Sequence, residues 1–398
     1  MRRKSTLTIS ILSIVLFYNC SNPSSESGKI VPAGDCSDII MDTTYSKVLT
    51  GTAGYDITKA SDCSYIISGS AGNTILMKID EFGNEVWSKS FDELSGSHWG
   101  KSINPTNDGG YIIGANQNTI IKTDSLGTME WHQKLSYSVA HYVEDVIQTS
   151  GGDYMVVGGV GGDPVGGDAV KGKAFMLRMS EGGSIQWVKR YGITDTPNNT
   201  FWGVVEADDG SFVLAGEKLQ DRNFEFYDHF WVMKTDANGD ELWSIESGGN
   251  LWDEARDIVK LSDGSYIVTG KISLSSTNLN MIVMRVSSEG EIIWQNNHGG
   301  GNYETGLSMT LTQDEDMVAV AGYTRSDSGS PFKYRIWGID VNSGQVLWNK
   351  THGGNQDDKA YGIVESLDGG FNVVGSSYSF GNERVNWMVK TDSVGNID

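Results

Sequence analysis

Residues 209–216, Asp209-Gly210-Ser211-Phe212-Val213-Leu214-Ala215-Gly216, decide the fold, because their pattern of a turn, an apolar strand and a closing glycine returns along the chain. Asp and Gly favour a tight turn, since Asp bonds its own backbone and Gly accepts a positive φ. The glycines that close the copies fall at positions 69, 114, 158, 216, 270, 322 and 375, so the period runs from 44 to 58 residues. Seven copies of one unit predict a repeat architecture.

A second element follows each copy and consists of a strand, a turn and a strand that carries Trp. It is clear in Lys234-Thr235-Asp236-Ala237-Asn238-Gly239-Asp240-Glu241-Leu242-Trp243, where Asp236 and Gly239 are residue types that a hairpin turn prefers. This Trp recurs at positions 87, 131, 187, 243, 294 and 348. A residue repeated at one position has one repeated task, and we expect these rings to dock neighbouring repeats. Three other Trp residues, at 231, 337 and 387, share a strand position and are expected in the core.

Each repeat is predicted to contain four antiparallel strands, of which segments such as 255–259 and 360–364 are the innermost. Four-stranded sheets repeated radially at this period make a β-propeller, and the fold class is therefore all-β with seven blades. The chain ends after the last turn without a final Trp strand, whereas Tyr45-Ser46-Lys47-Val48 matches Trp348-Asn349-Lys350-Thr351. We expect this N-terminal strand to complete the last blade and close the ring. A right-handed superhelix of repeats is the alternative, but it does not explain why the two ends complement each other.

These motifs resemble those of secreted bacterial β-propeller repeat proteins, which carry repeated DGGY-apolar-Gly and KTDxxGxxxW units. The resemblance covers residues 43–398. The Trp strand after Asp-x-x-Gly is also similar, more weakly, to the repeat of quinoprotein dehydrogenases, in which the Trp docks blade to blade. The resemblance implies a fold and an extracytoplasmic setting, but not a substrate, because propellers serve many functions.

The N-terminus predicts an export signal. Arg2, Arg3 and Lys4 precede an apolar run of about a dozen residues that ends just before Cys20, and such a run is too short to span a bilayer stably. We expect a lipoprotein-type signal peptide over residues 1–19, lipidation of Cys20, a flexible tether over 20–42 and the propeller over 43–398. Phe17 and Asn19 depart from the usual processing site, so an ordinary signal peptide or an uncleaved anchor stays open. The expected location is the bacterial cell envelope, as an outer-membrane lipoprotein facing the periplasm or the surface.

Charge and motifs exclude several function classes. The chain carries 30 Lys and Arg against 51 Asp and Glu, a net charge of −21, which argues against nucleic acid as a partner. The sequence contains no nucleophile elbow, HExxH motif, Walker loop or dinucleotide-binding fingerprint, and its six His residues share no metal-ligand spacing. We therefore expect no metal site and no cofactor. The acid pairs Asp253-Glu254 and Asp357-Asp358 are compatible with Ca²⁺ but are better explained as solvated loop charges.

Two cysteines remain after Cys20. Cys63 occupies a turn position where most other repeats have Gly, and Cys36 shortly precedes the strand expected to close the ring. In an oxidising compartment this placement is consistent with a disulfide between Cys36 and Cys63.

The loops between the second and third strands share one face of a propeller with the loops between blades. Five of them are long, and variable loops on a rigid scaffold commonly carry function. Aromatic residues on this face are candidates for contact with a ligand, with partly buried loop anchors as the alternative: Phe224, Phe226, Tyr227, His229, Trp252, Phe332, Tyr334, Tyr378 and Phe380.

Two function classes follow. The first is a lipid-anchored, monomeric and non-enzymatic propeller that binds or scaffolds a protein, peptide or glycan of the envelope. The second is an extracytoplasmic enzyme, either a quinoprotein-like oxidoreductase or a polysaccharide-acting enzyme, with its site over the central channel. The missing catalytic motif favours the first class.

Overall fold

The computed structural model describes residues 43–94, 99–135, 141–160, 173–192, 199–222, 225–248, 251–300 and 303–397. Within these ranges it describes all side chains except those of residues 141, 160, 220–222, 225 and 226. The predicted signal peptide, the lipidation site Cys20, the tether and Cys36 lie outside the described residues. They stay predictions.

In the described part of the chain every regular element is a β-strand. The 28 strands are β1 (Tyr45–Leu49), β2 (Ala53–Lys59), β3 (Tyr65–Ser70), β4 (Thr74–Ile79), β5 (Glu85–Ser90), β6 (Gly100–Pro105), β7 (Tyr111–Ala115), β8 (Thr119–Thr123), β9 (Met129–Lys134), β10 (His141–Gln148), β11 (Tyr154–Val160), β12 (Ala174–Met179), β13 (Ile185–Tyr191), β14 (Thr200–Glu206), β15 (Phe212–Arg222), β16 (Glu225–Thr235), β17 (Glu241–Ser247), β18 (Glu254–Lys260), β19 (Tyr266–Ser275), β20 (Asn278–Val286), β21 (Ile292–His298), β22 (Tyr303–Leu311), β23 (Met317–Arg325), β24 (Lys333–Asp340), β25 (Val346–His352), β26 (Asp358–Glu365), β27 (Phe371–Ser377) and β28 (Val385–Thr391).

The strands pair in sequence order as four-stranded antiparallel groups, which confirms the predicted all-β class and the predicted sheets. We call these groups repeat units: unit 1 is β2–β5, unit 2 β6–β9, unit 3 β10–β13, unit 4 β14–β17, unit 5 β18–β21, unit 6 β22–β25, and unit 7 β26–β28 with β1. One bridge between Gly159 and Thr200 joins the edges of units 3 and 4, and a parallel bridge between Leu279 and Tyr303 joins units 5 and 6.

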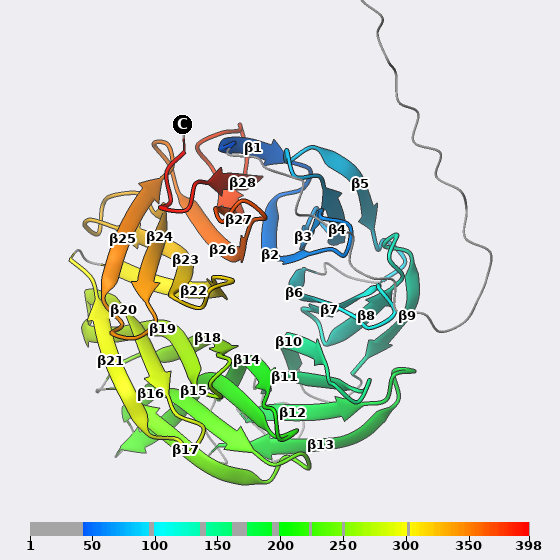
Figure 1. Ribbon diagram of the computed structural model, residues 1–398, viewed down its shortest axis with the longest axis vertical. Helices are drawn as coiled ribbons and strands as arrows, with labels where there is room; N and C mark the ends of the chain where they lie inside the picture. Colours follow the sequence, from blue (N-terminus) through cyan, green and yellow to red (C-terminus); the bar gives the residue numbers. More distant parts are fainter. Residues whose placement is uncertain are drawn as a thin grey trace, which may run out of the picture. The chain divides into compact units, whose positions relative to one another are not determined.

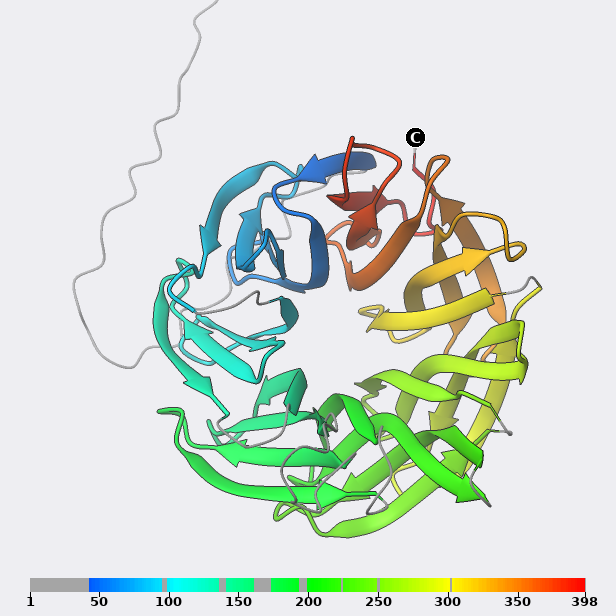
Figure 2. The ribbon, with the colours of Figure 1, turned by 180° about the vertical axis from the view of Figure 1, so that it is seen from behind.

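The repeat units follow one another around a common axis, as Figure 1 and the reverse view in Figure 2 show. In every unit the first strand lies nearest the axis and the fourth lies at the periphery (Figure 1). The first and second strands of each unit are joined by a tight turn whose backbone N–H groups are bonded within the turn, as between Gly210 and Ala207.

The hydrophobic core lies between units. Each of seven clusters of buried side chains combines residues of two neighbouring units, for example Met155 and Val157 of unit 3 with Leu214 and Trp231 of unit 4. One cluster combines Val374 and Met388 of unit 7 with Ile67 of unit 1. Neighbouring sheets are therefore held together by apolar burial, which is the main favourable contribution to folding.

Strand β1 forms the outer edge of unit 7. It pairs antiparallel with β28, and Tyr45 lies opposite Lys390 in the same register in which Trp243 lies opposite Lys234. Tyr45 thus takes the position that Trp takes in the other units. The segment before unit 1 completes a sheet whose other three strands are formed by the last part of the chain.

The Trp at this repeated position packs against the turn of the next unit. A Cβ on the turn glycine would lie 2.6 Å from the ring of Trp87 at Gly127 and 3.1 Å from the ring of Trp131 at Gly183. The same contact joins Tyr45 of unit 7 to Gly83 of unit 1. These glycines also have positive φ, so both the backbone conformation and the aromatic neighbour require the absence of a side chain.

Candidate functional site

The seven innermost strands line a central channel with a cavity of about 610 Å³. Residues of β2, β6, β10, β14, β18, β22 and β26 all contribute to its wall. Because each repeat unit contributes one strand, the channel is the place where residues far apart in the sequence meet.

Every innermost strand contains a β-bulge at one position. The register with the second strand shifts there by one residue, for example between Gly54 and Asp56 in β2 and between Ala255 and Asp257 in β18. A bulge re-aims a side chain and is frequent beside active sites. The bulged residues all line the channel and are Tyr55, Lys101, Glu144, Trp202, Arg256, Leu307 and Tyr361.

The residue after the bulge connects neighbouring units in three places. One carboxylate oxygen of Asp56 accepts the N–H of Ile57 at 2.8 Å, and the other accepts the N–H of Ile103 in unit 2 at 2.8 Å. Asp145 accepts in the same way from Val204 of unit 4, and Asp257 from Met309 of unit 6.

Burial raises the pKa of all three carboxyl groups against the lowering effect of these backbone hydrogen bonds, to about 8 for Asp56, about 6 for Asp145 and about 7 for Asp257. Both oxygens of each group already accept backbone N–H groups, so we assign these carboxyls to the connection between units.

Charged bulge residues gather on one side of the channel mouth. Lys101 forms an ion pair with Glu144 at 2.5 Å, and the guanidinium of Arg256 lies 3.7 Å from the ring centre of Trp202. Arg256 also pairs with Glu254, which bonds Lys271 at 2.5 Å. Although burial opposes the shift, Arg256 and Lys271 lower the pKa of Glu254 below its usual range.

Two aromatic bulge residues, Tyr55 and Tyr361, lie together on the other side. The rings of Tyr55 and Tyr361 are 5.3 Å apart, and Tyr55 stacks on Trp99 at 5.9 Å. A terminal nitrogen of Arg384 lies 3.5 Å from the hydroxyl oxygens of both tyrosines. The guanidinium is therefore held over the aromatic pair by weak hydrogen bonds.

A second aromatic cluster lies on unit 6. Tyr303, Tyr323 and Phe332 pack with ring centres 5.0 to 5.7 Å apart. Arg325 lies 4.8 Å and the ammonium of Lys359 4.3 Å from the ring centre of Phe332. Two cations thus contact one aromatic ring.

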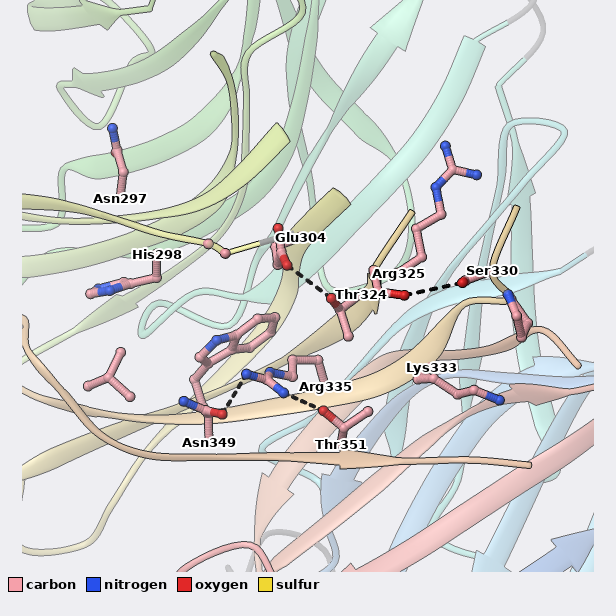
Figure 3. Close-up of a pocket in the computed structure, with 16 residues that line it drawn as sticks. Asn297, His298, Glu304, Thr324, Arg325, Ser330, Lys333, Arg335, Asn349 and Thr351 are labelled. Atoms are coloured by element: carbon pink, nitrogen blue, oxygen red, sulfur yellow. Dashed lines mark hydrogen bonds between the residues drawn. The ribbon is translucent and has the colours of Figure 1, made fainter. Parts of the chain in front are cut away.

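A separate pocket of about 750 Å³ opens between units 5 and 6, and Figure 3 shows its lining. Arg335 of β24 lies between Asn349 and Thr351 of β25 and donates to both side chains, at 2.5 Å to Asn349 (Figure 3). Across the pocket, Thr324 donates to Glu304 at 3.1 Å. Burial lowers the pKa of Arg335, which is the effect expected of a partly desolvated cation.

The predicted ligand-face aromatics divide into three groups. Phe224 and the side chain of Phe226 lie outside the described part. Trp252, Tyr378 and Phe380 are exposed, by 63%, 44% and 44%, while Tyr227 and Phe332 are half-buried. Their contact with a ligand stays a prediction.

Tyr334 and His229 correct the prediction. Tyr334 is fully buried, donates its hydroxyl to the carbonyl of Trp387 at 2.7 Å and belongs to the core between units 6 and 7. His229 is only 7% exposed. Strands β16 and β24 extend into segments that the sequence predicted as loops, so their alternation turns these two side chains inward.

Cys63 is disulfide-bonded in the structure, and its partner lies outside the described residues. The pairing with Cys36 therefore stays a prediction. Cys63 has φ 69°, in the left-handed region that Gly109, Gly152 and Gly210 occupy at the same turn of other units.

The acid pairs considered for Ca²⁺ make bonds within the protein. Asp253 accepts the N–H of Ser273 at 2.6 Å, Asp357 accepts the N–H of Phe332 at 2.9 Å, and Asp358 accepts from Gly354 at 2.8 Å. Among the described residues no group of three or more His, Cys, Asp or Glu is arranged to hold a metal ion.

From its place between two repeats, Trp202 is a candidate either to face the central channel or to pack between units. Sequence reasoning missed the other residues of the channel ring, by which we mean the seven bulged residues of the innermost strands, and the pocket around Arg335. The ring had a partial signal, because the bulged residue precedes Asp at positions 55, 144 and 256. Bulges depend on register with the next strand, which the sequence does not display. The pocket had no signal, because its lining comes from five separate segments.

Comparison with known proteins shows which folds this chain is similar to. Residues 228–377 match the family model described as outer membrane protein assembly factor BamB. No curated protein matches the chain. Among solved structures, the WD40 β-propeller domain of Doa1 has 13% identity and a TM-score of 0.56, with 87% of this chain and 96% of that chain covered.

Quinohemoprotein alcohol dehydrogenase from Comamonas testosteroni has 10% identity and a TM-score of 0.55, with coverage of 86% and 68%. A protein of unknown function from Bacteroides caccae has 15% identity and a TM-score of 0.44, with coverage of 72% and 90%. The likenesses to the Doa1 domain and to the quinohemoprotein, both with TM-scores above 0.5, show that the chain has a β-propeller repeat fold. None of the described residues forms a helix of the length and hydrophobicity needed to traverse a lipid bilayer.

Proposed function

We propose that this chain is a closed, seven-bladed β-propeller of the bacterial envelope that binds a protein partner and has no catalytic activity of its own. Three features support closure: seven four-stranded units, a core between units 7 and 1, and the pairing of β1 with β28. The match of residues 228–377 to a model named for an outer-membrane assembly factor supports an envelope setting and a protein partner.

The binding role is supported by a contrast among the bulges that line the channel: their backbone geometry is the same in every unit, whereas their side chains differ from unit to unit. Seven bulges at one structural position present Tyr, Lys, Glu, Trp, Arg, Leu and Tyr again. On the loops of the same face, Trp252 is 63% exposed. A scaffold that keeps its backbone and varies its side chains at one face suits recognition, and exposed Trp is frequent at the centre of protein interfaces.

The finer location follows from the N-terminus. We propose that residues 1–19 direct export, that Cys20 carries the lipid anchor and that residues 20–42 tether a monomeric propeller to the outer membrane. The net charge of −21 is consistent with a partner other than nucleic acid.

The enzymatic alternative is not favoured by the channel chemistry. The carboxyl groups of raised pKa at Asp56, Asp145 and Asp257 accept backbone N–H groups with both oxygens. Lys101 and Glu144 are already paired with each other. We therefore propose neither a quinoprotein-like nor a polysaccharide-acting enzyme.

The test uses the full-length chain in its own envelope, with a photo-crosslinking residue at position 252 on the channel-mouth face. The control places the same residue at position 126, where Leu126 is 64% exposed on a turn of the opposite face. We expect a discrete crosslinked protein from position 252 and none from position 126, and Trp252→Ala is expected to weaken co-purification of that protein. Equal crosslinking at the two positions, or none at either, contradicts the proposal.

A further inference from the structure

The pocket between units 5 and 6 and the cations beside it form a strip of positive charge on an acidic protein. Arg335, Arg325, Lys359 and Arg384 lie on units 6 and 7, and among the described residues none of them has a carboxylate within ion-pair distance. Lys333, at the pocket rim, pairs with Asp358 at 3.8 Å. The whole chain has a net charge of −21, so an unpaired row of cations stands out against its surroundings.

The strip is continuous. Arg325 lines the pocket that holds Arg335 and also contacts Phe332 at 4.8 Å, and Lys359 contacts the same ring at 4.3 Å. Burial lowers the pKa of Lys359, and the nearby carboxylate of Asp357 opposes this effect. Arg384 and Arg325 add to the lowering because they are like charges close by. Arg384 ends the strip over Tyr55 and Tyr361.

The pocket itself combines one cation with groups that accept and donate. Arg335 donates one N–H to the side chain of Asn349 and one to that of Thr351. Because a guanidinium has five N–H groups, the others remain available to bind an anion. Glu304, Asn297 and Ser330 line the same cavity, and Trp337 and Val346 give it an apolar part. A carboxylate needs only donors, whereas sugar hydroxyls need both donors and acceptors beside an apolar surface.

We propose that this pocket and strip bind an acidic glycan, with the carboxylate of one uronic acid residue at Arg335 and further carboxylates along Arg325, Lys359 and Arg384. This goes beyond the protein partner proposed above and uses neither Trp252 nor the channel bulges as ligands. The pocket volume of about 750 Å³ lies in the range of small-molecule sites. Charge-assisted hydrogen bonds to guanidinium and ammonium groups supply the selectivity for carboxylate.

The experiment measures binding to the purified full chain by calorimetry, with galacturonic acid as monomer and as tetramer, a neutral glucose tetramer and a glutamate pentapeptide. We expect the acidic tetramer to bind about tenfold more tightly than the monomer and the neutral tetramer to bind at least about tenfold more weakly. Comparing monomer with tetramer separates a free sugar acid from a residue of a longer glycan.

Variants separate the pocket from the strip. Arg335→Gln is expected to abolish binding of monomer and tetramer, and Arg335→Lys to restore part of it. The double variant with Lys359→Gln and Arg384→Gln is expected to bind the monomer unchanged. It is expected to bind the acidic tetramer no more tightly than the monomer. Arg190→Gln removes an exposed cation of β13 in unit 3 and serves as the matched control.

Four outcomes would overturn the proposal: no saturable binding of either acid, unchanged binding in Arg335→Gln, equal binding of the neutral tetramer, or tighter binding of the glutamate peptide. The last result assigns the strip to an acidic protein segment instead. Melting temperatures of all variants are measured in parallel, so a folding defect is recognised as such. The partner crosslinked from position 252 is scored separately, and its presence or absence does not bear on glycan binding.

Discussion

At the scale of single residues, the aromatic and the glycine of neighbouring units depend on each other. Trp243 donates its indole N–H to the carbonyl of Ser288 at 3.1 Å and would contact a Cβ on Gly290 at 2.7 Å. Two histidines also contact the turn of the next unit. One ring nitrogen of His298 lies 3.1 Å from the carbonyl oxygen of Gly344, and one ring nitrogen of His352 lies 2.9 Å from that of Gly395. These residues recur because the same turn must be contacted in each unit.

We expect Trp243→Ala to lower the free energy of unfolding by about 2–4 kcal/mol, because it removes a large partly buried ring and leaves a cavity between units 4 and 5. Denaturant unfolding measures this change. Leu242→Ala is the control, since Leu242 is 57% exposed, and we expect a change within about 0.5 kcal/mol. Equal stability of the two variants would remove the docking role.

The buried carboxyl of Asp56 predicts a dependence of stability on pH. Burial raises its pKa to about 8, while in the unfolded chain it is about 3.9. Between these values the folded state holds a proton that the unfolded state has lost, so the contribution of Asp56 is complete below about pH 4 and declines as pH rises towards 8.

We expect Asp56 to account for at most about 3 kcal/mol of the fall in the free energy of unfolding between pH 5.5 and 8, beside smaller contributions from Asp145 and Asp257. Asp56→Asn is expected to reduce this fall. Urea unfolding at the two pH values measures it. Glu383→Gln, which neutralises an exposed carboxyl, serves as the control and is expected to behave like the unmodified protein. An identical pH response in Asp56→Asn would contradict the raised pKa.

At the scale of elements, β1 connects the two ends of the described chain. Its five residues pair with β28, Tyr45 packs on Gly83 of unit 1, and Leu49 belongs to the core shared by units 7 and 1. Without β1, β28 has an unpaired edge, and such edges associate with other chains.

A chain that begins at residue 50 is expected to melt at a lower temperature than one that begins at residue 43 and to associate with increasing concentration. Thermal unfolding and size-exclusion chromatography at several concentrations measure the two effects. Both chains lack the N-terminal 42 residues, so the comparison isolates β1. Matching melting temperatures and elution volumes would show that β1 contributes nothing to the fold.

At the scale of the whole molecule, the pairing of β1 with β28 joins parts of the chain that are far apart in sequence, and a covalent link is expected at the same junction. Cys63 is disulfide-bonded, and the sequence points to Cys36 as its partner. A disulfide that closes a loop of this length stabilises a protein by about 3.5 kcal/mol in the loop-entropy model.

We expect peptide mapping of the unreduced protein to recover Cys36 and Cys63 in one linked peptide, and reduction to lower the melting temperature. Cys36→Ser with Cys63→Ser is expected to reproduce the reduced protein. Recovery of both thiols free, or of Cys63 linked to Cys20, would contradict the pairing.

Local patterns carried most of the fold. Asp209-Gly210, Asp236 and Gly239 code for turns through their own backbone preferences, and Gly210 and Gly239 both have positive φ in the structure. Trp231, Trp337 and Trp387 were predicted in the core from their shared strand position and are 1%, 3% and 2% exposed. Turn chemistry and strand alternation act over a few residues, so the chain displays them directly.

The candidate sites depended on distances that the chain does not display. The bulge that turns Arg256 towards Trp202 arises from the register between β18 and β19, and Arg335 meets Glu304 only because β22 and β24 flank β23. Strand extension buried Tyr334 for the same reason, since the length of β24 is set by pairing with β23. The sequence by itself thus determines the repeated unit, its turns and the order of its strands, because these depend on local patterns. The ring of bulged residues in the channel and the strip of positive charge on units 6 and 7 exist only in the tertiary structure, because packing between units brings separate strands together.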